Sequence, residues 1–238
     1  MKNKSKAMRN MLFGMLGAAI CMAAMWLSSA YGKDNDRNGL IMSNWPKMPM
    51  IRFELSIIFI AIGVPLYYLG AKEMIKALRL SRRRRSINDL RMAKLFDMCM
   101  HLSVIGLVFT QGVFVTIAIT YKLLFGTKLM GADIMYVVER QFYYFAAPVF
   151  AYLVFSLAGT SIAYMYFIIN DRMKVSKICI LFNPLIMFGI GELLKLTKLY
   201  YLEDFAAAMI PFGFLLMLAA GMVHVAKMPD ARRRRREQ

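Results

Sequence analysis

Long blocks without a charged residue constrain this 238-residue chain more than any other feature. A helix needs about 20 mainly apolar residues to cross the hydrocarbon core of a bilayer, and several blocks reach that length. Hydrophobic residues make up 59% of the chain and charged residues only 19%, whereas soluble domains contain about a quarter charged residues. This pattern excludes a disordered chain, a collagen-like fibre and a disulfide scaffold, and it indicates a polytopic membrane protein.

The spacing of the charges predicts six membrane-spanning helices. They are expected at about 10–32, 54–77, 98–121, 141–170, 178–195 and 205–226. The fifth is the weakest, because only 14 uncharged residues separate Lys177 from Glu192. No alternation of polar and apolar residues at the period of a strand accompanies the blocks, so helices are favoured over a β-barrel. We therefore expect an all-α integral membrane protein built as a single six-helix bundle.

The distribution of lysine and arginine predicts the orientation, because these residues are retained on the cytoplasmic side of a span. With six helices, four segments share a side with the N-terminus, namely 1–10, 72–97, 170–177 and 227–238. They hold 22 of the 31 basic residues, and the opposite side holds 9. We expect both termini in the cytoplasm, a basic cytoplasmic linker over 82–97, a basic tail over 227–238 and a location in the cell (cytoplasmic) membrane.

Residues 1–30 also have features of a secretory signal peptide. The first nine residues include four basic ones, and Ser28-Ser29-Ala30 resembles the small-residue cleavage site of a signal peptide. The apolar stretch is longer than the usual core of about 7–15 residues, which favours an uncleaved first helix. Cleavage after Ala30 would instead leave five spans and an external N-terminus.

Two arginine runs carry much of the net charge of +17. Each follows an apolar span on the expected inner side, where a basic residue near an anionic leaflet contributes about 1 kcal/mol. The runs therefore act as determinants of topology, and anionic lipid headgroups are the expected partners. The residues expected to contact headgroups are Arg82, Arg83, Arg84, Arg85, Arg232 and Arg233. Nucleic acid is not expected as a partner, because neither a folded nucleic-acid-binding motif nor interleaved aromatic residues accompany the arginine runs.

Polar residues within the spans are the default place to look for function, because they are costly in lipid. Glu54 begins the second expected helix, Glu192 lies near the end of the fifth, and Gln111 is in the middle of the third. Lys195 follows Glu192 at the spacing of a helical ion pair, and Gln111 can hydrogen-bond to a neighbouring helix, so both also have structural interpretations. The functional interpretation places Glu54, Gln111 and Glu192 around a ligand site in the outer half of the membrane.

Four prolines support a cavity without requiring one. Pro65, Pro148, Pro184 and Pro211 are each expected to break a backbone hydrogen bond in a different helix. Interrupted helices surround the ligand in some transporters, but proline is also simply common in membrane helices.

The two histidines, His101 and His224, are expected at similar depth in the inner half of the membrane. Such a pair on facing helices is what bis-histidine haem ligation requires, but an interfacial histidine bonded to a headgroup or a carbonyl is the simpler interpretation. We expect no metal and no cofactor, with His101 and His224 as the weak candidates for ligands. No catalytic residue is identified, because neither GxSxG, HExxH nor a Walker motif occurs, and an enzyme is the less favoured class.

Several short motifs occur in a recognisable order: Trp45 in the first outer loop, "GVPLYYLG" (Gly63–Gly70), His101, "FNPL" (Phe182–Leu185) and Pro211–Gly213. This order resembles a family of uncharacterised bacterial multi-pass membrane proteins that is defined only as a domain of unknown function. The chain departs from that pattern at Trp26–Ser29, where an acidic residue is expected. The resemblance implies an architecture and a bacterial origin, and it implies no mechanism.

Three functions are compatible with these features. The leading hypothesis is binding or translocation of a small or lipid-like molecule through the outer-half polar site. The first alternative is a membrane enzyme that acts on lipid headgroups, with the inner arginines holding the anionic substrate. The second alternative is a structural or assembly partner without a ligand. The sequence does not predict the oligomeric state.

Overall fold

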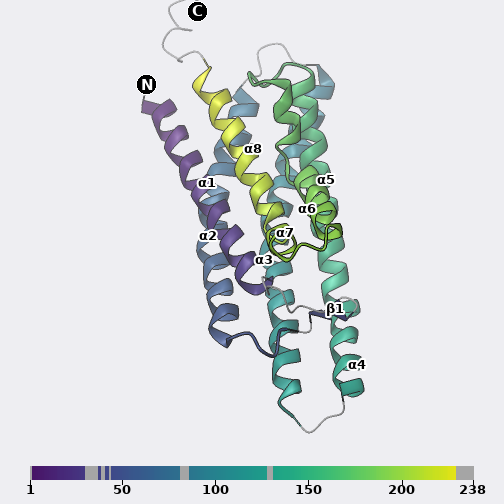
Figure 1. Ribbon diagram of the computed structural model, residues 1–238. Coiled ribbons are helices and arrows are strands. Elements are labelled where there is room, and N and C mark those ends of the chain that lie inside the picture. The colour runs from purple at the N-terminus through teal and green to yellow at the C-terminus, as the bar shows by residue number, and fades with distance from the viewer. Residues whose placement is uncertain are drawn as a thin grey trace, which may run out of the picture.

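A computed structural model shows a helical bundle with one short hairpin (Figure 1). It describes residues 2–29, 37–38, 41–42, 44–80, 86–127 and 131–228. The α-helices are α1 (Lys2–Ser29), α2 (Met50–Leu80), α3 (Ile87–Phe125), α4 (Gly131–Gln141), α5 (Ala147–Ile169), α6 (Pro184–Leu196), α7 (Tyr200–Ala206) and α8 (Met209–Ala226). A π-helical segment η1 (Phe142–Ala146) joins α4 to α5, and a 3-10 turn η2 (Lys177–Leu181) precedes α6. Strands β1 (Arg37–Asn38) and β2 (Ile41–Met42) pair antiparallel.

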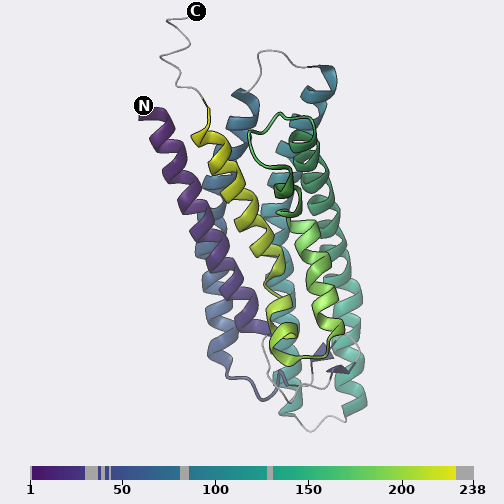
Figure 2. The same ribbon diagram turned by 45° about the horizontal axis from the view of Figure 1, so that its top comes forward.

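The start of α1 and the end of α8 lie at the same end of the bundle (Figure 1). The Lys4 ammonium donates hydrogen bonds to the carbonyl oxygens of Ala226, at 2.5 Å, and Met228, at 3.1 Å. The end of α2, the start of α3 and the end of α5 lie at this end too (Figure 2). We refer to it as the terminal end and to the opposite end as the loop end.

Five helices of the described segments are long and apolar enough to cross a membrane. They are Lys4–Ser29, Met50–Arg79, Ile87–Phe125, Asp133–Ile169 and Met209–Ala226. These helices indicate a multi-pass membrane protein, and they overlap the first, second, third, fourth and sixth spans expected from the sequence. Helices α2 and α3 extend beyond their apolar blocks at both ends. The 39 residues of α3 measure about 58 Å, nearly twice the thickness of a hydrocarbon core. Most of the linker expected over 82–97 is therefore the first part of α3.

The segment expected as the fifth span, 178–195, is not one helix. It divides into η2 and the 13-residue α6, with Phe182 and Asn183 between them. The reason is the Asn183-Pro184 pair: the proline cannot donate to the preceding turn, and asparagine favours the start of a new helix. Alone, α6 is about 20 Å long and too short to cross the hydrocarbon core. It runs antiparallel to α8 (Figure 2).

The start of α6 has its backbone donors fully paired. Asn183 is completely buried, and its Oδ1 accepts hydrogen bonds from the amides of Leu185, at 3.1 Å, and Ile186, at 3.0 Å. Its carbonyl accepts from the amide of Met187 at 3.0 Å, and Pro184 has no amide hydrogen. Helix starts that bind a substrate in transporters have free amides, so this start lacks the donors for such a role.

The prolines do not all break helices as expected. Pro184 and Pro211 lie in the first turns of α6 and α8, where an amide has no acceptor within the helix, so they begin helices instead of kinking them. Pro65 lies inside the continuous helix α2. Pro148 follows the π-helical segment η1, whose wider turn accommodates the acceptor that a proline leaves unpaired.

Helices α1 and α2 pack closely through glycines. A Cβ atom on Gly17 would lie 2.3 Å from the Tyr67 amide nitrogen and 2.5 Å from the Gly63 carbonyl oxygen. A Cβ atom on Gly14 would lie 2.6 Å from Gly70 Cα. Only a hydrogen atom fits at these positions, and small residues of this kind let two membrane helices approach closely. The two glycines that bound "GVPLYYLG" are thus packing positions.

A second apolar core covers the loop end. The main core joins α1, α2, α3, α5 and α8, and the second one packs Trp45 and Met48 against the last turns of α3 and one face of α4. The Lys122 ammonium holds the 44–49 segment in place, because it donates to the carbonyl oxygens of Pro46, at 2.6 Å, and Met48, at 2.7 Å.

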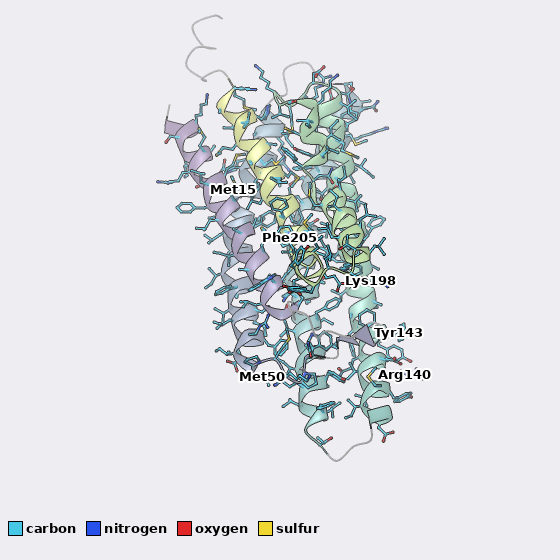
Figure 3. All side chains as sticks on the ribbon, in the orientation of Figure 1. Met15, Met50, Arg140, Tyr143, Lys198 and Phe205 are labelled. Carbon is cyan, nitrogen blue, oxygen red and sulfur yellow. The ribbon has the colours of Figure 1, made fainter. Side chains whose placement is uncertain are left out.

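Aromatic rings are exposed on α4 and η1. The Arg140 guanidinium lies 5.1 Å from the centre of the Tyr136 ring and donates to Tyr144 Oη at 2.9 Å. Tyr143 is 62% exposed beside it (Figure 3). Tyrosines and arginines of this kind suit the headgroup region at a membrane surface.

A buried carboxylate joins α3 to α5 at the terminal end. Asp89 is completely buried in the first turn of α3. Its Oδ2 accepts from the Ser86 amide at 3.0 Å and pairs with Arg172 at 2.9 Å, while Oδ1 accepts from Tyr166 Oη at 3.1 Å. The Ser86 hydroxyl in turn accepts from the Asp89 amide, which completes a capping box.

Candidate functional site

The outer-half residues expected around one ligand lie in different surroundings. Glu54 is exposed on α2, whereas Gln111 is buried within the bundle. Glu192 is about half exposed and forms an ion pair with Lys195 at 2.5 Å. No hydrogen bond or ion pair joins these three residues within the described ranges.

Gln111 serves as a link between helices. Its Nε2 donates to the hydroxyls of Ser28, at 2.8 Å, and Ser56, at 2.6 Å. Ser56 donates onward to the Ala24 carbonyl at 2.8 Å. Both amide hydrogens of Gln111 are therefore used to join α3 to α1 and α2, which favours its packing interpretation.

The histidines have separate partners. His224 on α8 is buried, and its Nδ1 accepts a hydrogen bond from the Lys174 amide at 2.9 Å. His101 instead contacts α2, as described below. No group of three or more His, Cys, Asp or Glu side chains within the described residues could hold a metal ion. The arginines expected at lipid headgroups, Arg82 to Arg85, Arg232 and Arg233, lie outside the described residues.

A hydrogen-bonded chain of polar side chains joins α2 to α3 near the terminal end. The His101 and Tyr68 rings meet edge to face, and His101 Nε2 lies 3.2 Å from Tyr68 Oη. His101 Nδ1 lies 2.6 Å from the Asp97 carbonyl oxygen and 3.3 Å from Asp97 Oδ1. The Asp97 carboxylate forms an ion pair with Arg79. We refer to Tyr68, Lys72, Arg79, Lys94, Asp97 and His101 as the α2–α3 polar cluster.

The direction of each hydrogen bond in this chain follows from the partners. A carbonyl oxygen can only accept, so Nδ1 of a neutral His101 carries the proton and Nε2 has a free electron pair. Nε2 must then accept the hydrogen bond, and Tyr68 Oη donates it. Asp97 thus sets the tautomer of His101, and Arg79 balances the charge of Asp97.

Two exposed lysines belong to the same faces of the two helices. Lys72 lies one turn beyond Tyr68 on α2, and Lys94 lies one turn before Asp97 on α3. Neither ammonium forms an ion pair with a described residue. Because Arg79 and Asp97 neutralise each other, the cluster has a net charge of +2 while His101 is neutral.

The cluster lies where the apolar part of each helix ends. The His101 side chain is 43% exposed. On the same face of α3, toward the loop end, the next residues are Ile105 and Val108, which are exposed and apolar and form part of an apolar stripe. On α2, the face that holds Tyr68 continues toward the loop end with the exposed apolar residues Pro65 and Ala61. Polar groups therefore adjoin an exposed apolar surface, which is the pattern that a lipid headgroup with its acyl chains requires.

The sequence drew attention to His101 and counted 72–97 among the basic segments, but it did not connect His101 with Lys72 or Arg79. The connection needs the pairing of α2 with α3, which the spacing within one helix cannot supply. Nothing in the sequence marked Tyr68 as a candidate site residue, because it lies within an apolar block. The helical spacing of Lys94, Asp97 and His101 was a usable signal, and the expectation of a linker over 82–97 hid it.

Comparison with known proteins identifies a family. A family model described as "Family of unknown function (DUF6796)" matches residues 1–228. No curated protein and no solved structure matches the chain.

Proposed function

The chain belongs to this family of unknown function, and we propose that it is a multi-pass membrane protein that binds an anionic lipid headgroup at the α2–α3 polar cluster. In this proposal η2 and α6 together make the sixth crossing, and both termini are cytoplasmic. The common position of the start of α1 and the end of α8 and the excess of basic residues in the neighbouring sequence support this orientation.

The observation that carries the proposal is the net positive charge of the cluster beside an exposed apolar stripe. Lys72 and Lys94 supply two charges without an ion-pair partner among the described residues, and Tyr68 and His101 supply hydrogen-bonding groups next to them. Charge and hydrogen bonding together match an anionic headgroup, whereas a zwitterionic headgroup has no net charge to pair. The outer-half residues Glu54, Gln111 and Glu192 offer no comparable convergence.

Lipid-dependent thermal stability tests this function. Purified protein in bilayer discs of phosphatidylcholine, with or without a minor fraction of anionic lipid, is unfolded by heat. We expect anionic lipid to raise the midpoint of unfolding, because a ligand that binds only the folded state stabilises it. The double variant Lys72→Gln/Lys94→Gln should lose most of this rise.

A matched control removes two lysines that lie away from the terminal end. Lys47 and Lys198 are exposed, and Lys198 lies in the turn between α6 and α7, away from the termini (Figure 3). Lys47→Gln/Lys198→Gln changes the net charge equally, so it should retain the response to anionic lipid. An equal loss in both double variants would mean that total charge matters and that the α2–α3 polar cluster is not the site.

A further inference from the structure

The position of the proton within the α2–α3 polar cluster points to a particular class of headgroup. Tyr68 Oη donates to His101 Nε2, and Nδ1 already donates to Asp97. Nε2 can therefore take up a proton without breaking the bond to Asp97. When it does, Nε2 becomes a donor, and the Tyr68 hydroxyl must turn its hydrogen toward another acceptor. The cluster is thus built to receive a proton and an acceptor oxygen together.

We infer that the cluster selects a phosphomonoester headgroup and takes the proton of that headgroup onto His101 Nε2, an inference that rests on the proposed function. A singly ionised phosphomonoester supplies both parts, because its second ionisation lies near pH 6. One P–O–H bond loses its proton, one Nε2–H bond forms, and the Tyr68 hydroxyl moves its hydrogen bond from Nε2 to a phosphate oxygen. No electron is transferred and no other bond breaks.

The charges near His101 favour this exchange. On its own helix, Asp97 accepts from Nδ1 and stabilises the imidazolium, while Lys94 lies one turn further along. On α2, Tyr68 is the contact, Arg79 pairs with Asp97, and Lys72 adds a second free positive charge. The resulting phosphate carries two negative charges and faces the two lysines. A phosphodiester headgroup carries one negative charge and has no proton to give, so it can use the lysines only.

Binding of two lipids that differ in this property tests the inference. Phosphatidate is a phosphomonoester and phosphatidylglycerol is a phosphodiester, and each is titrated into phosphatidylcholine discs at about pH 6, where a phosphomonoester still holds its second proton in part. We expect the protein to bind phosphatidate about tenfold more tightly, the usual magnitude of one added charge-assisted hydrogen bond. His101→Gln and Tyr68→Phe should bind both lipids equally, at the phosphatidylglycerol level.

A spectroscopic measurement separates proton transfer from simple contact. The chain has only two histidines, so comparison with His101→Gln assigns the imidazole nitrogen signals of protein labelled with ¹⁵N-histidine. Phosphatidate should convert the His101 Nε2 signal from the unprotonated to the protonated class, and phosphatidylglycerol should not. Equal binding of the two lipids by the unaltered protein, or an unprotonated Nε2 in the phosphatidate complex, would overturn the inference while leaving anionic lipid binding intact.

Two further outcomes have distinct meanings. Failure of both lipids to bind the unaltered protein would instead contradict the proposed function. Competition with soluble glycerol 3-phosphate distinguishes the sources of the phosphomonoester. Displacement of phosphatidate by it supports recognition of a soluble ester, and retention of phosphatidate supports recognition of a membrane lipid.

Discussion

Single side chains at the terminal end show how polar groups are tolerated in this apolar protein. Asp89 is completely buried, and its two carboxylate oxygens together have partners on three different residues. A buried carboxylate is stable only with such complete pairing, because its loss of hydration must be offset. Gln111 follows the same rule, since both of its amide hydrogens are used.

Replacement of Asp89 should therefore destabilise the protein strongly. Asp89→Ala leaves Arg172 and Tyr166 without their common partner and removes the capping box, and we expect a loss of about 3 kcal/mol. Asp89→Asn keeps an acceptor for Tyr166 and should lose less. The measurement is unfolding in mild detergent, with Asp133→Ala on the exposed face of α4 as the control. An Asp89→Ala protein that unfolds with the same free energy as the control would refute this role.

The sequence was informative about some residues of the candidate site and silent about others. His101 stood out because histidine is rare in this chain, and Lys72 stood out because it ends an apolar block. The role of Asp97 in setting the tautomer depends on a side chain within its own helix and was open to prediction. The role of Tyr68 depends on a neighbouring helix, and no local pattern contains that information.

At the scale of helices and strands, long uncharged blocks were reliable for the presence of a span and unreliable for its ends. Hydropathy indicates which residues can lie in the hydrocarbon core. A helix can continue past those residues, because its length depends on backbone hydrogen bonding. The first part of α3, from Ile87, is helical although it is polar, because the capping box begins the helix there. The segment with the fewest uncharged residues was also the one that divided, at Asn183-Pro184.

The contact between α1 and α2 gives a prediction at this scale. Gly17→Ala places a methyl group within 2.3 Å of the Tyr67 amide nitrogen, so the two backbones must separate. We expect a loss of about 1–3 kcal/mol, the usual cost of overpacking. Gly112 is the matched control, because a Cβ atom there meets nothing within 4 Å. Gly112→Ala should be neutral or slightly stabilising, since alanine favours a helix over glycine.

Thermal unfolding of the two glycine variants under identical conditions makes this comparison. The outcome that contradicts the account is a Gly17→Ala protein at least as stable as Gly112→Ala. That result would mean that α1 and α2 are further apart than a glycine contact allows.

For the whole molecule, the charge asymmetry and the fold agree with each other. Among the described residues, most lysines and arginines lie in segments near the terminal end, and the α2–α3 polar cluster lies in the halves of α2 and α3 next to that end. Five helices qualify as spans within the described residues, yet the start of α1 and the end of α8 lie at the same end of the bundle, because η2 and α6 return the chain toward the loop end before α8 begins (Figure 2). The cluster can meet an anionic inner leaflet only if the terminal end is cytoplasmic.

Labelling of single cysteines in intact cells tests that central claim most directly. In a background without Cys21, Cys99 and Cys179, cysteine is placed at Ser5 and Lys227 for the terminal end, and at Lys47 and Lys198 for the loops expected on the other side of the membrane. We predict that a membrane-impermeant thiol reagent labels positions 47 and 198 in intact cells, and labels positions 5 and 227 only after the cells are permeabilised. Labelling of position 5 and position 227 from opposite sides of the membrane would contradict the account.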